Sequence, residues 1–174
     1  LKETRGSVIV ITDDDCTVPP NWLETFASIF VTYPKVAVAF CCVEAGEHDK
    51  AAGFVPDFVR TGDRMLTTAH DARDVHGLGA GIAVRRDMIE AIGGFDPMLG
   101  PGSRFHDCDD RDIAIRALLA RYHVYETSAI AVKQATSTIP IVVVGAADLI
   151  AAGLVGNLAH PGGNLTGTSS QSTA

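Results

Sequence analysis

The sequence is poor in cysteine and in basic residues, and both shortages exclude classes of protein. Its four cysteines lie at positions 16, 41, 42 and 108, without a CxxC spacing or a regular framework of pairs. A disulfide-stapled fold is therefore excluded, and we expect buried thiols in a reducing compartment. Fourteen basic residues against twenty-one acidic ones give a net charge of −7. This charge leaves no electrostatic footprint for nucleic acid.

Targeting and membrane segments are also missing from the pattern. No basic stretch followed by an apolar run opens the sequence, so a secretory signal is not indicated and a cytoplasmic location is expected. The long apolar stretch over residues 139–159 carries Asp148 at its centre. A central aspartate costs about 2.5 to 3.5 kcal/mol in a membrane helix. We therefore predict a strand followed by a helix in this stretch, with no membrane association encoded.

What is present is the composition of a packed globular protein of about one domain. The 174 residues are 47% hydrophobic and 20% charged, which excludes disordered and fibrous classes. Buried strands are predicted at 7–12 and 35–43, and a helix capped by Asn21 is predicted to carry Trp22, Leu23, Phe26, Ile29 and Phe30 on one face. The other predicted elements are helix and loop over 44–74, a strand ending at 84, helices over 86–92 and from 109 onward, and a strand pair over 122–132.

Three aspartates, Asp13 to Asp15, follow the first predicted strand, where open α/β sheets bind their ligands. Carboxylates crowded there require something positive nearby. Because alternate side chains of a strand point the same way, Asp13 and Asp15 are predicted to face one ligand and Asp14 the other side. Carboxylate oxygens favour Mg²⁺ or Mn²⁺ bound to a diphosphate. An exposed acidic turn with a helix cap explains the same residues equally well.

A second acidic group, HDCDDRD over residues 106–112, follows a glycine-rich loop and begins a predicted helix. The helix dipole favours aspartates in this first turn. One of them can serve as a general base for a sugar or alcohol hydroxyl. Plain capping of the helix is the alternative.

Three alternating glycines, Gly77, Gly79 and Gly81, match a dinucleotide-binding fingerprint only in part, because no strand leads into them. We interpret them as a site of close backbone packing or as a substrate loop. The six histidines show no paired spacing for zinc.

With both acidic groups placed, residues 1–132 resemble the family 2 glycosyltransferases, which are inverting enzymes of the GT-A type. VIVITDDDCTVPPNWLETF resembles the strand, DxD metal motif and helix of that family, and GLGAGIAVRRDMIEAIGGFDPMLGPG resembles its acceptor-side segment. FHDCDDRDIAIRALLARYHVYE resembles its ED-containing loop and helix. The resemblance implies transfer of a sugar from a nucleotide-diphospho-sugar donor to a hydroxyl acceptor, with inversion.

The resemblance also implies roles for individual residues. Asp13 and Asp15 would hold Mg²⁺ or Mn²⁺ together with the sugar diphosphate, and Asp13 and Asp14 would contact the nucleotide-sugar. Asp110 would be the catalytic base. Secondary candidates are Asp109, which stands where the family more often has glutamate, together with Asp112, Gly79 and Gly81.

The final segment differs in kind, because residues 134–172 resemble part of an ABC-transporter substrate-binding protein, with TIPIV as a strand and HPGGNLTG as a turn. We expect a chimera of two pieces, residues 1–132 and residues 133–174. Only LKETRG precedes the first strand, so the first piece is expected to lack its N-terminal nucleotide-binding half and to have little activity alone. The alternative function is that of a non-enzymatic ligand-binding fragment.

The expected fold is therefore α/β. It consists of a truncated GT-A-like, Rossmann-like mixed sheet with flanking helices, followed by a C-terminal strand-helix segment.

Overall fold

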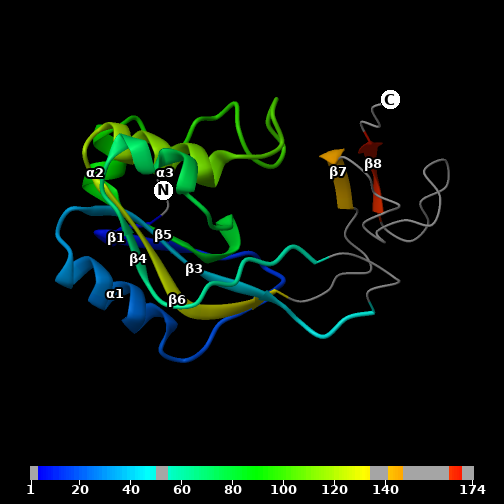
Figure 1. Ribbon diagram of the computed structural model, residues 1–174, viewed down its shortest axis with the longest axis horizontal. Helices are drawn as coiled ribbons and strands as arrows, with labels where there is room; N and C mark the ends of the chain where they lie inside the picture. Colours follow the sequence, from blue (N-terminus) through cyan, green and yellow to red (C-terminus); the bar gives the residue numbers. More distant parts are fainter. Residues whose placement is uncertain (1–3, 50–54, 134–140, 147–164, 170–174) are drawn as a thin grey trace. The chain divides into compact units, whose positions relative to one another are not determined.

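The computed structural model describes residues 4–49, 55–133, 141–146 and 165–169. The chain divides into two compact units, one of residues 1–44 and 57–133 and the other of residues 45–56 and 134–174. The first unit is built on a sheet with the strand order β1-β5-β3-β6-β2, and β4 pairs with β6 (Figure 1). In the second unit, β7 (Ile141–Ala146) pairs in parallel with β8 (Leu165–Ser169).

The larger sheet is mixed, as the sequence predicted. Its strands are β1 (Val8–Ile11), β2 (Cys16–Thr17), β3 (Val36–Ala45), β4 (Arg64–Leu66), β5 (Ile82–Arg85) and β6 (His123–Lys133). The β5 strand runs antiparallel to β1 and β3, and β6 runs antiparallel to β2 and β4. The neighbours β3 and β6 begin at the same end, because the His123 N–H donates to the Lys35 carbonyl at 2.9 Å. They therefore run parallel.

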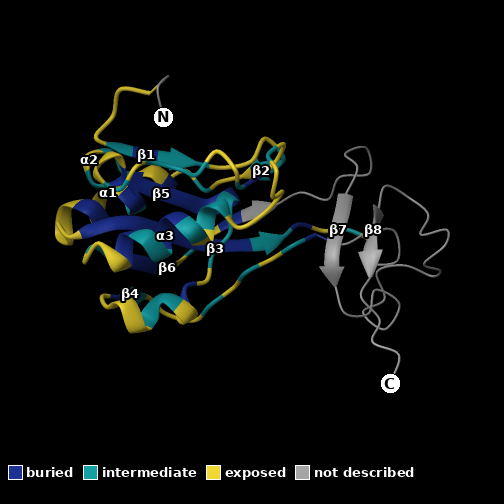
Figure 2. Ribbon diagram, turned by 90° about the horizontal axis from the view of Figure 1, so that it is seen from above, coloured by how far each residue is buried: buried dark blue, intermediate teal, exposed yellow. Residues whose placement is uncertain are grey.

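Helices cover both faces of this sheet (Figure 1). The α1 helix (Trp22–Thr32) lies on one face, and α2 (Arg86–Ala91) and α3 (Asp109–Leu119) lie on the other. Within β3, Ala39 and Cys41 pack on the α1 side and Val38 and Phe40 on the α3 side. Because both faces of the sheet are covered, β3 is a continuous apolar run. Figure 2 shows most of this strand as buried.

The α1 helix begins where the sequence predicts, after Asn21, although the Asn21 side chain makes no capping hydrogen bond. Trp22, Phe26, Ile29 and Phe30 are buried against the sheet. Leu23 was predicted on the same face, and this was wrong, because its side chain is 62% exposed. It follows Trp22 by one position, which turns it about 100° away from the buried stripe. No helix among the described residues is long and apolar enough to cross a membrane.

Two of the predicted segments differ from the structure. Residues 44–74 were predicted as helix and loop, but they contain β4 and a 3₁₀ helix, η1 (Ala69–Asp74). A strand of three residues is too short to show alternation, and it forms by pairing with β6. Residues 122–132 were predicted as a strand pair and instead form the single strand β6. The C-terminal helix predicted beyond β7 lies outside the described residues.

The cysteines are all free, as the sequence predicted. Cys41 and Cys42 are buried in β3, whereas Cys16 is half-buried and Cys108 is exposed. The expectation of buried thiols was therefore wrong for Cys108, because that residue stands in the loop before α3 rather than in the sheet.

The three alternating glycines lie at and before the short 3₁₀ helix η2 (Gly79–Gly81), and two of them are sites of close packing. A Cβ atom at Gly77 would lie 2.3 Å from the Phe40 ring, and one at Gly81 would lie 2.5 Å from the Cys41 Sγ. A Cβ atom at Gly79 would make only ordinary contact, 3.8 Å from an Asp110 carboxylate oxygen. The interpretation as close backbone packing is confirmed for Gly77 and Gly81.

We expect Gly81→Ala to lower the free energy of unfolding by about 1–3 kcal/mol, because the new methyl group would have to displace side chains of a packed strand. Gly79→Ala is the matched control in the same 3₁₀ helix, and we expect it to unfold close to wild type. Urea unfolding followed by circular dichroism measures both. Equal midpoints for the two variants would contradict the packing argument.

Candidate active site

The first acidic group lies in a turn between β1 and β2. The strand part of β1 ends at Ile11, and the Cys16 N–H closes the turn by donating to the Asp13 carbonyl at 3.2 Å. Oxygen atoms of Asp13 and Asp15 and the Cys16 Sγ lie within 4.8 Å of one another. Asp14 is exposed and outside this group. The expected pairing of Asp13 with Asp15 is therefore present, but a turn produces it rather than the alternation of an extended strand.

The donor set of this turn fits a hard divalent cation. Two carboxylates are the usual protein contribution to a magnesium site, with waters and substrate phosphates as the remaining ligands. The third member is a soft thiol, which such cations do not prefer, and the Cys16 Sγ lies 3.7 Å from the Asp15 Oδ1 as its hydrogen-bond donor. Asp13 is exposed and Asp15 half-buried. The carboxylates can therefore be reached by a bound diphosphate.

The second acidic group occupies the first turn of α3. Cys108 precedes the helix with a φ of 72°, in the left-handed region, and this turns the chain into the helix at Asp109. Asp110 accepts a hydrogen bond from the Arg111 N–H at 2.6 Å. The Gly79 backbone N–H lies near the same carboxylate and counteracts part of the rise in its pKa. Burial raises the pKa of Asp110 above its ordinary value, and the charges of Asp109 and Asp107 raise it further. A carboxylate with a raised pKa is a stronger base.

The strand register connects the two acidic groups. Ile11, at the end of β1, is paired with Ile82, at the start of β5. The η2 helix immediately precedes Ile82 and lies against β1, and its first residue, Gly79, lies against Asp110. The turn with Asp13 and Asp15 and the start of α3 therefore belong to the same end of the sheet.

The other two aspartates of α3 have different surroundings. Asp109 packs under the loop before the helix, since a Cβ at Gly100 would lie 2.8 Å from its carboxylate carbon. Asp112 forms an ion pair with Arg116 at 2.7 Å. Arg116 also donates to the carbonyls of Ile92 and Gly94, so this pair ties α3 to the end of α2. Asp110, by contrast, lines a cavity.

That cavity has a volume of about 300 Å³ and lies entirely within the first unit. Its polar lining is Asp57, His76, Asp107, Asp110 and Arg111. The apolar part of the lining comes from Phe40, Phe58, Val75 and Leu78. This volume is at the lower end of the range for ligand sites. The cavity therefore has room for a small polar group such as one sugar ring.

Sequence reasoning missed the residues that come from 57–76. Phe58 exchanges two backbone hydrogen bonds with Val43, at 2.9 and 2.7 Å, and its ring stacks on His76 with 5.9 Å between centroids. Neither residue belongs to a periodic pattern or to a motif. The sequence alone therefore could not predict that either residue lines the cavity.

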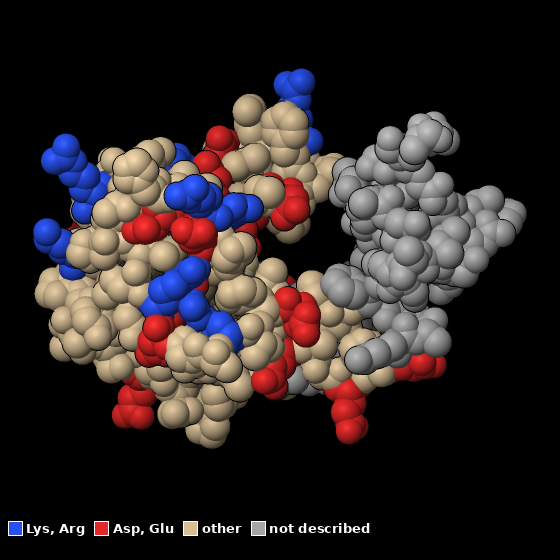
Figure 3. All heavy atoms as spheres, in the orientation of Figure 1, with Lys and Arg blue, Asp and Glu red and all other residues tan. Residues whose placement is uncertain are grey.

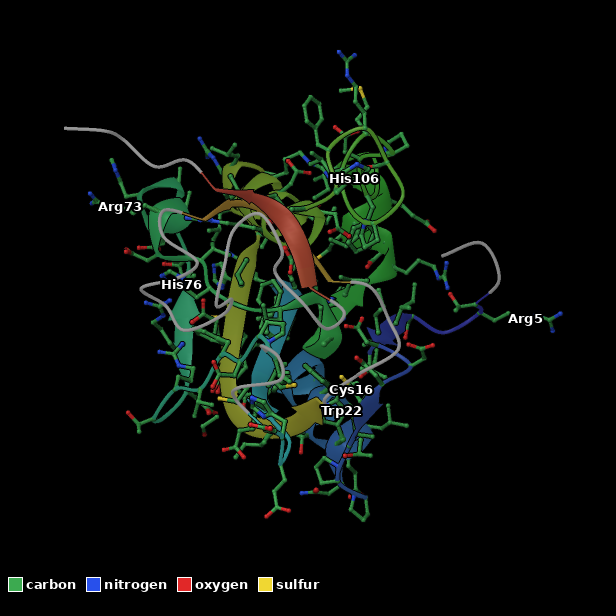
Figure 4. All side chains as sticks on the ribbon, turned by 90° about the vertical axis from the view of Figure 1, so that its right-hand side faces the viewer. Arg5, Cys16, Trp22, Arg73, His76 and His106 are labelled. Carbon is green, nitrogen blue, oxygen red and sulfur yellow. The ribbon has the colours of Figure 1, made fainter. Side chains whose placement is uncertain are left out.

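Figure 4 views this end of the sheet and labels one residue from each of its three segments. Cys16 marks the turn after β1, His76 marks the segment before η2, and His106 marks the loop before α3. Figure 3 shows acidic and basic side chains interspersed on the face it presents. That face carries no extended basic patch on the described residues, in keeping with the low basic content of the sequence.

Comparisons with known proteins match two family models to overlapping parts of the chain. The family model for glycosyltransferase-like family 2 matches residues 1–143, and the model for ABC transporter substrate-binding proteins matches residues 124–174. A mannosyltransferase from Pyrobaculum calidifontis, PcManGT, solved with GDP-Man and Mn²⁺, is a structural match with 19% sequence identity and a TM-score of 0.46. The match covers 76% of this chain and 33% of that one, so the chain spans about a third of its length. No curated protein matched.

Proposed function

Since this chain belongs to the glycosyltransferase-like family 2, we propose that it transfers a sugar from a nucleotide-diphospho-sugar to an acceptor hydroxyl with inversion. One observation carries the proposal. The strand pairing of Ile11 with Ile82 and the proximity of Gly79 to Asp110 bring the turn with Asp13 and Asp15 and the Asp110 carboxylate, whose pKa is raised, to one end of the sheet. A metal-assisted displacement on a sugar diphosphate requires both at one site.

In the proposed reaction, Asp110 accepts the proton of the acceptor hydroxyl. The acceptor oxygen forms a bond to the anomeric carbon while the bond from that carbon to the diphosphate oxygen breaks. The nucleoside diphosphate leaves with the electron pair, and attack from the opposite side inverts the anomeric configuration. The Arg111 N–H holds the Asp110 carboxylate in place for this step, and Gly79 lies against the carboxylate.

The proposed metal ligands are Asp13 and Asp15. Asp14 is proposed to contact the nucleotide-sugar. A bound Mg²⁺ or Mn²⁺ would neutralise the departing diphosphate. By binding that ion, the carboxylates would place the diphosphate end of the donor at the end of β1, where η2 and α3 also begin.

The proposed acceptor enters the cavity beside Asp110. Three carboxylates against the single Arg111 line this space, and such a balance favours an uncharged, hydroxyl-rich acceptor over an acidic one. The Phe58 ring offers an apolar surface for the C–H face of a sugar.

The experiment is to incubate the chain with Mn²⁺, a panel of nucleotide-sugars, and neutral or acidic sugars as acceptors. We expect slow release of nucleoside diphosphate with a neutral acceptor, in line with the low activity expected of this chain alone, and proton NMR of the product should show the inverted anomer. Retention of configuration would overturn the proposed displacement, and release that is unaffected by removing Mn²⁺ would overturn the metal site.

A second candidate function, ligand binding, is favoured by the match of residues 124–174 to substrate-binding proteins. We propose that the transferase part ends at residue 132 and that residues 133–174 form a separate piece. A chain ending at Lys133 is therefore expected to release nucleoside diphosphate as the full chain does. Loss of release in the shortened chain would contradict this boundary.

A further inference from the structure

A buried carboxylate that the proposed function does not use lies in β6. Glu126 has no exposed surface. Its carboxylate forms ion pairs with Arg60 and with Arg64, the latter at 2.8 Å. A fully buried carboxylate requires such partners, and removing one side of a buried pair leaves the other uncompensated.

The same carboxylate holds the segment that forms one wall of the cavity. Its Oε1 accepts the His76 backbone N–H at 3.0 Å, and Arg64, held by Glu126, donates to the Asp74 carbonyl. These two bonds fix the backbone on both sides of Val75, which is 1% exposed and lines the cavity.

A second part of the cavity lining is attached to Glu126 through Arg60. The Arg60 backbone N–H donates to the Cys42 Sγ at 3.2 Å, which holds it beside β3. Two residues earlier, Phe58 lines the cavity and stacks on His76. One carboxylate therefore ties both parts of the lining to the same strand.

From His76 the fixed segment leads directly to the proposed base. Gly77 lies tightly against the Phe40 ring, so the chain has little freedom to shift there. Two residues further on, Gly79 lies against Asp110, where a Cβ atom would be 3.8 Å from a carboxylate oxygen, and its N–H lowers the pKa of that carboxylate. A displacement at His76 is therefore expected to reach Gly79 and the Asp110 carboxylate.

We propose that Glu126 is a positioning residue, which holds the cavity wall at residues 74–79 and thereby orients the Gly79 N–H toward Asp110. The inference rests on the proposed function, because it assigns Glu126 to the placement of the proposed base. It predicts an effect on the His76 and Gly79 amides in addition to any general loss of stability from the broken ion pairs.

A matched control is available in Asp63, a second acidic residue bound to β6. Asp63 accepts hydrogen bonds from the Tyr125 and Thr127 hydroxyls and from the Ser128 N–H and hydroxyl. These partners flank Glu126 in the strand, but none belongs to residues 74–79. Loss of Asp63 would therefore weaken the same strand without releasing the cavity wall.

The experiment compares Glu126→Gln with Asp63→Asn in the full chain by NMR. We expect Glu126→Gln to speed amide exchange at His76 and Gly79 by about tenfold, the worth of a hydrogen bond to a charged group. It should also shift the Gly79 amide resonance, whereas Asp63→Asn should leave both unchanged. Unchanged His76 and Gly79 amides in Glu126→Gln, or equal changes in the two variants, would overturn the proposal.

If Glu126→Gln does not fold, Arg64→Lys serves the same purpose. Lysine keeps the charge but cannot bridge Glu126 and the Asp74 carbonyl as the arginine does, so the same two amides should change. No change there would count equally against the proposal. Release of nucleoside diphosphate is measured beside Asp110→Asn. If Asp110→Asn keeps its rate, the proposed function fails while the amide measurements still decide the role of Glu126.

Discussion

Asp110→Asn is expected to lower the rate of sugar transfer by about 10²–10⁴-fold, the usual contribution of a general base, and to leave Mn²⁺ binding unchanged. Asparagine keeps the shape and can still accept the Arg111 N–H bond, but it cannot take a proton. The measurement is release of nucleoside diphosphate from the donor, with calorimetric titration of Mn²⁺ on the same samples.

The pH dependence of the wild-type transfer rate and of the stability of Asp110→Asn provides a second check. Burial raises the pKa of Asp110 above its ordinary value of 3.8, so the wild-type rate should fall as pH decreases through that raised value, as the base becomes protonated. The folded state binds this proton more tightly than the unfolded chain, so ionisation of Asp110 opposes folding as pH rises through the same range. Asp110→Asn should therefore be at least as stable as wild type at pH 7, with that advantage absent below about pH 3.8.

Asp87→Asn is the matched control for Asp110→Asn. Asp87 lies in the first turn of α2, and it accepts the N–H of the next residue at 2.9 Å, as Asp110 does in α3. It is exposed and does not line the cavity. Its variant should keep the wild-type rate. A transfer rate in Asp110→Asn equal to that of Asp87→Asn would rule out Asp110 as the base.

Asp15→Ala is expected to remove Mn²⁺ binding. Changing residues that only support a metal ligand costs about 10–100-fold in affinity, and loss of one of two carboxylate ligands should exceed this. Because Asp13 and Asp15 carry like charges within 4.8 Å, the variant also relieves repulsion and should not unfold the turn. Calorimetric titration with Mn²⁺, with and without a uridine diphosphate sugar, measures the loss.

Asp14→Ala distinguishes coordination of the metal ion from its attraction by the general negative charge of the turn. Asp14 lies between the two proposed ligands but is not part of their group, so its variant should retain Mn²⁺ affinity while removing the same charge. Contact with the nucleotide-sugar, if made by Asp14, would appear as weaker donor binding at constant Mn²⁺ affinity. Equal loss of Mn²⁺ binding in Asp14→Ala and Asp15→Ala would show that charge alone attracts the ion.

Local patterns were sufficient for much of the fold. The β-branched run over 7–12 and the apolar run over 35–43 form β1 and β3, because strands covered on both faces leave a continuous hydrophobic trace in sequence. The helix starts at Trp22 and Asp109 were also predicted, since both depend on residues within one turn. Short β4 was missed because it is stabilised only by its partner strand.

The sequence by itself determined which residues are chemically suited to the site, namely clustered aspartates at the end of a buried strand and at the start of a helix. Residue type and near neighbours fix both features, so they are legible along the chain. The tertiary structure alone decided that Gly79 meets Asp110, that Phe58 stacks on His76, and that Glu126 ties the cavity walls together. The residues in these contacts are at least 18 positions apart in the sequence. Only strand pairing and burial bring such distant residues into contact.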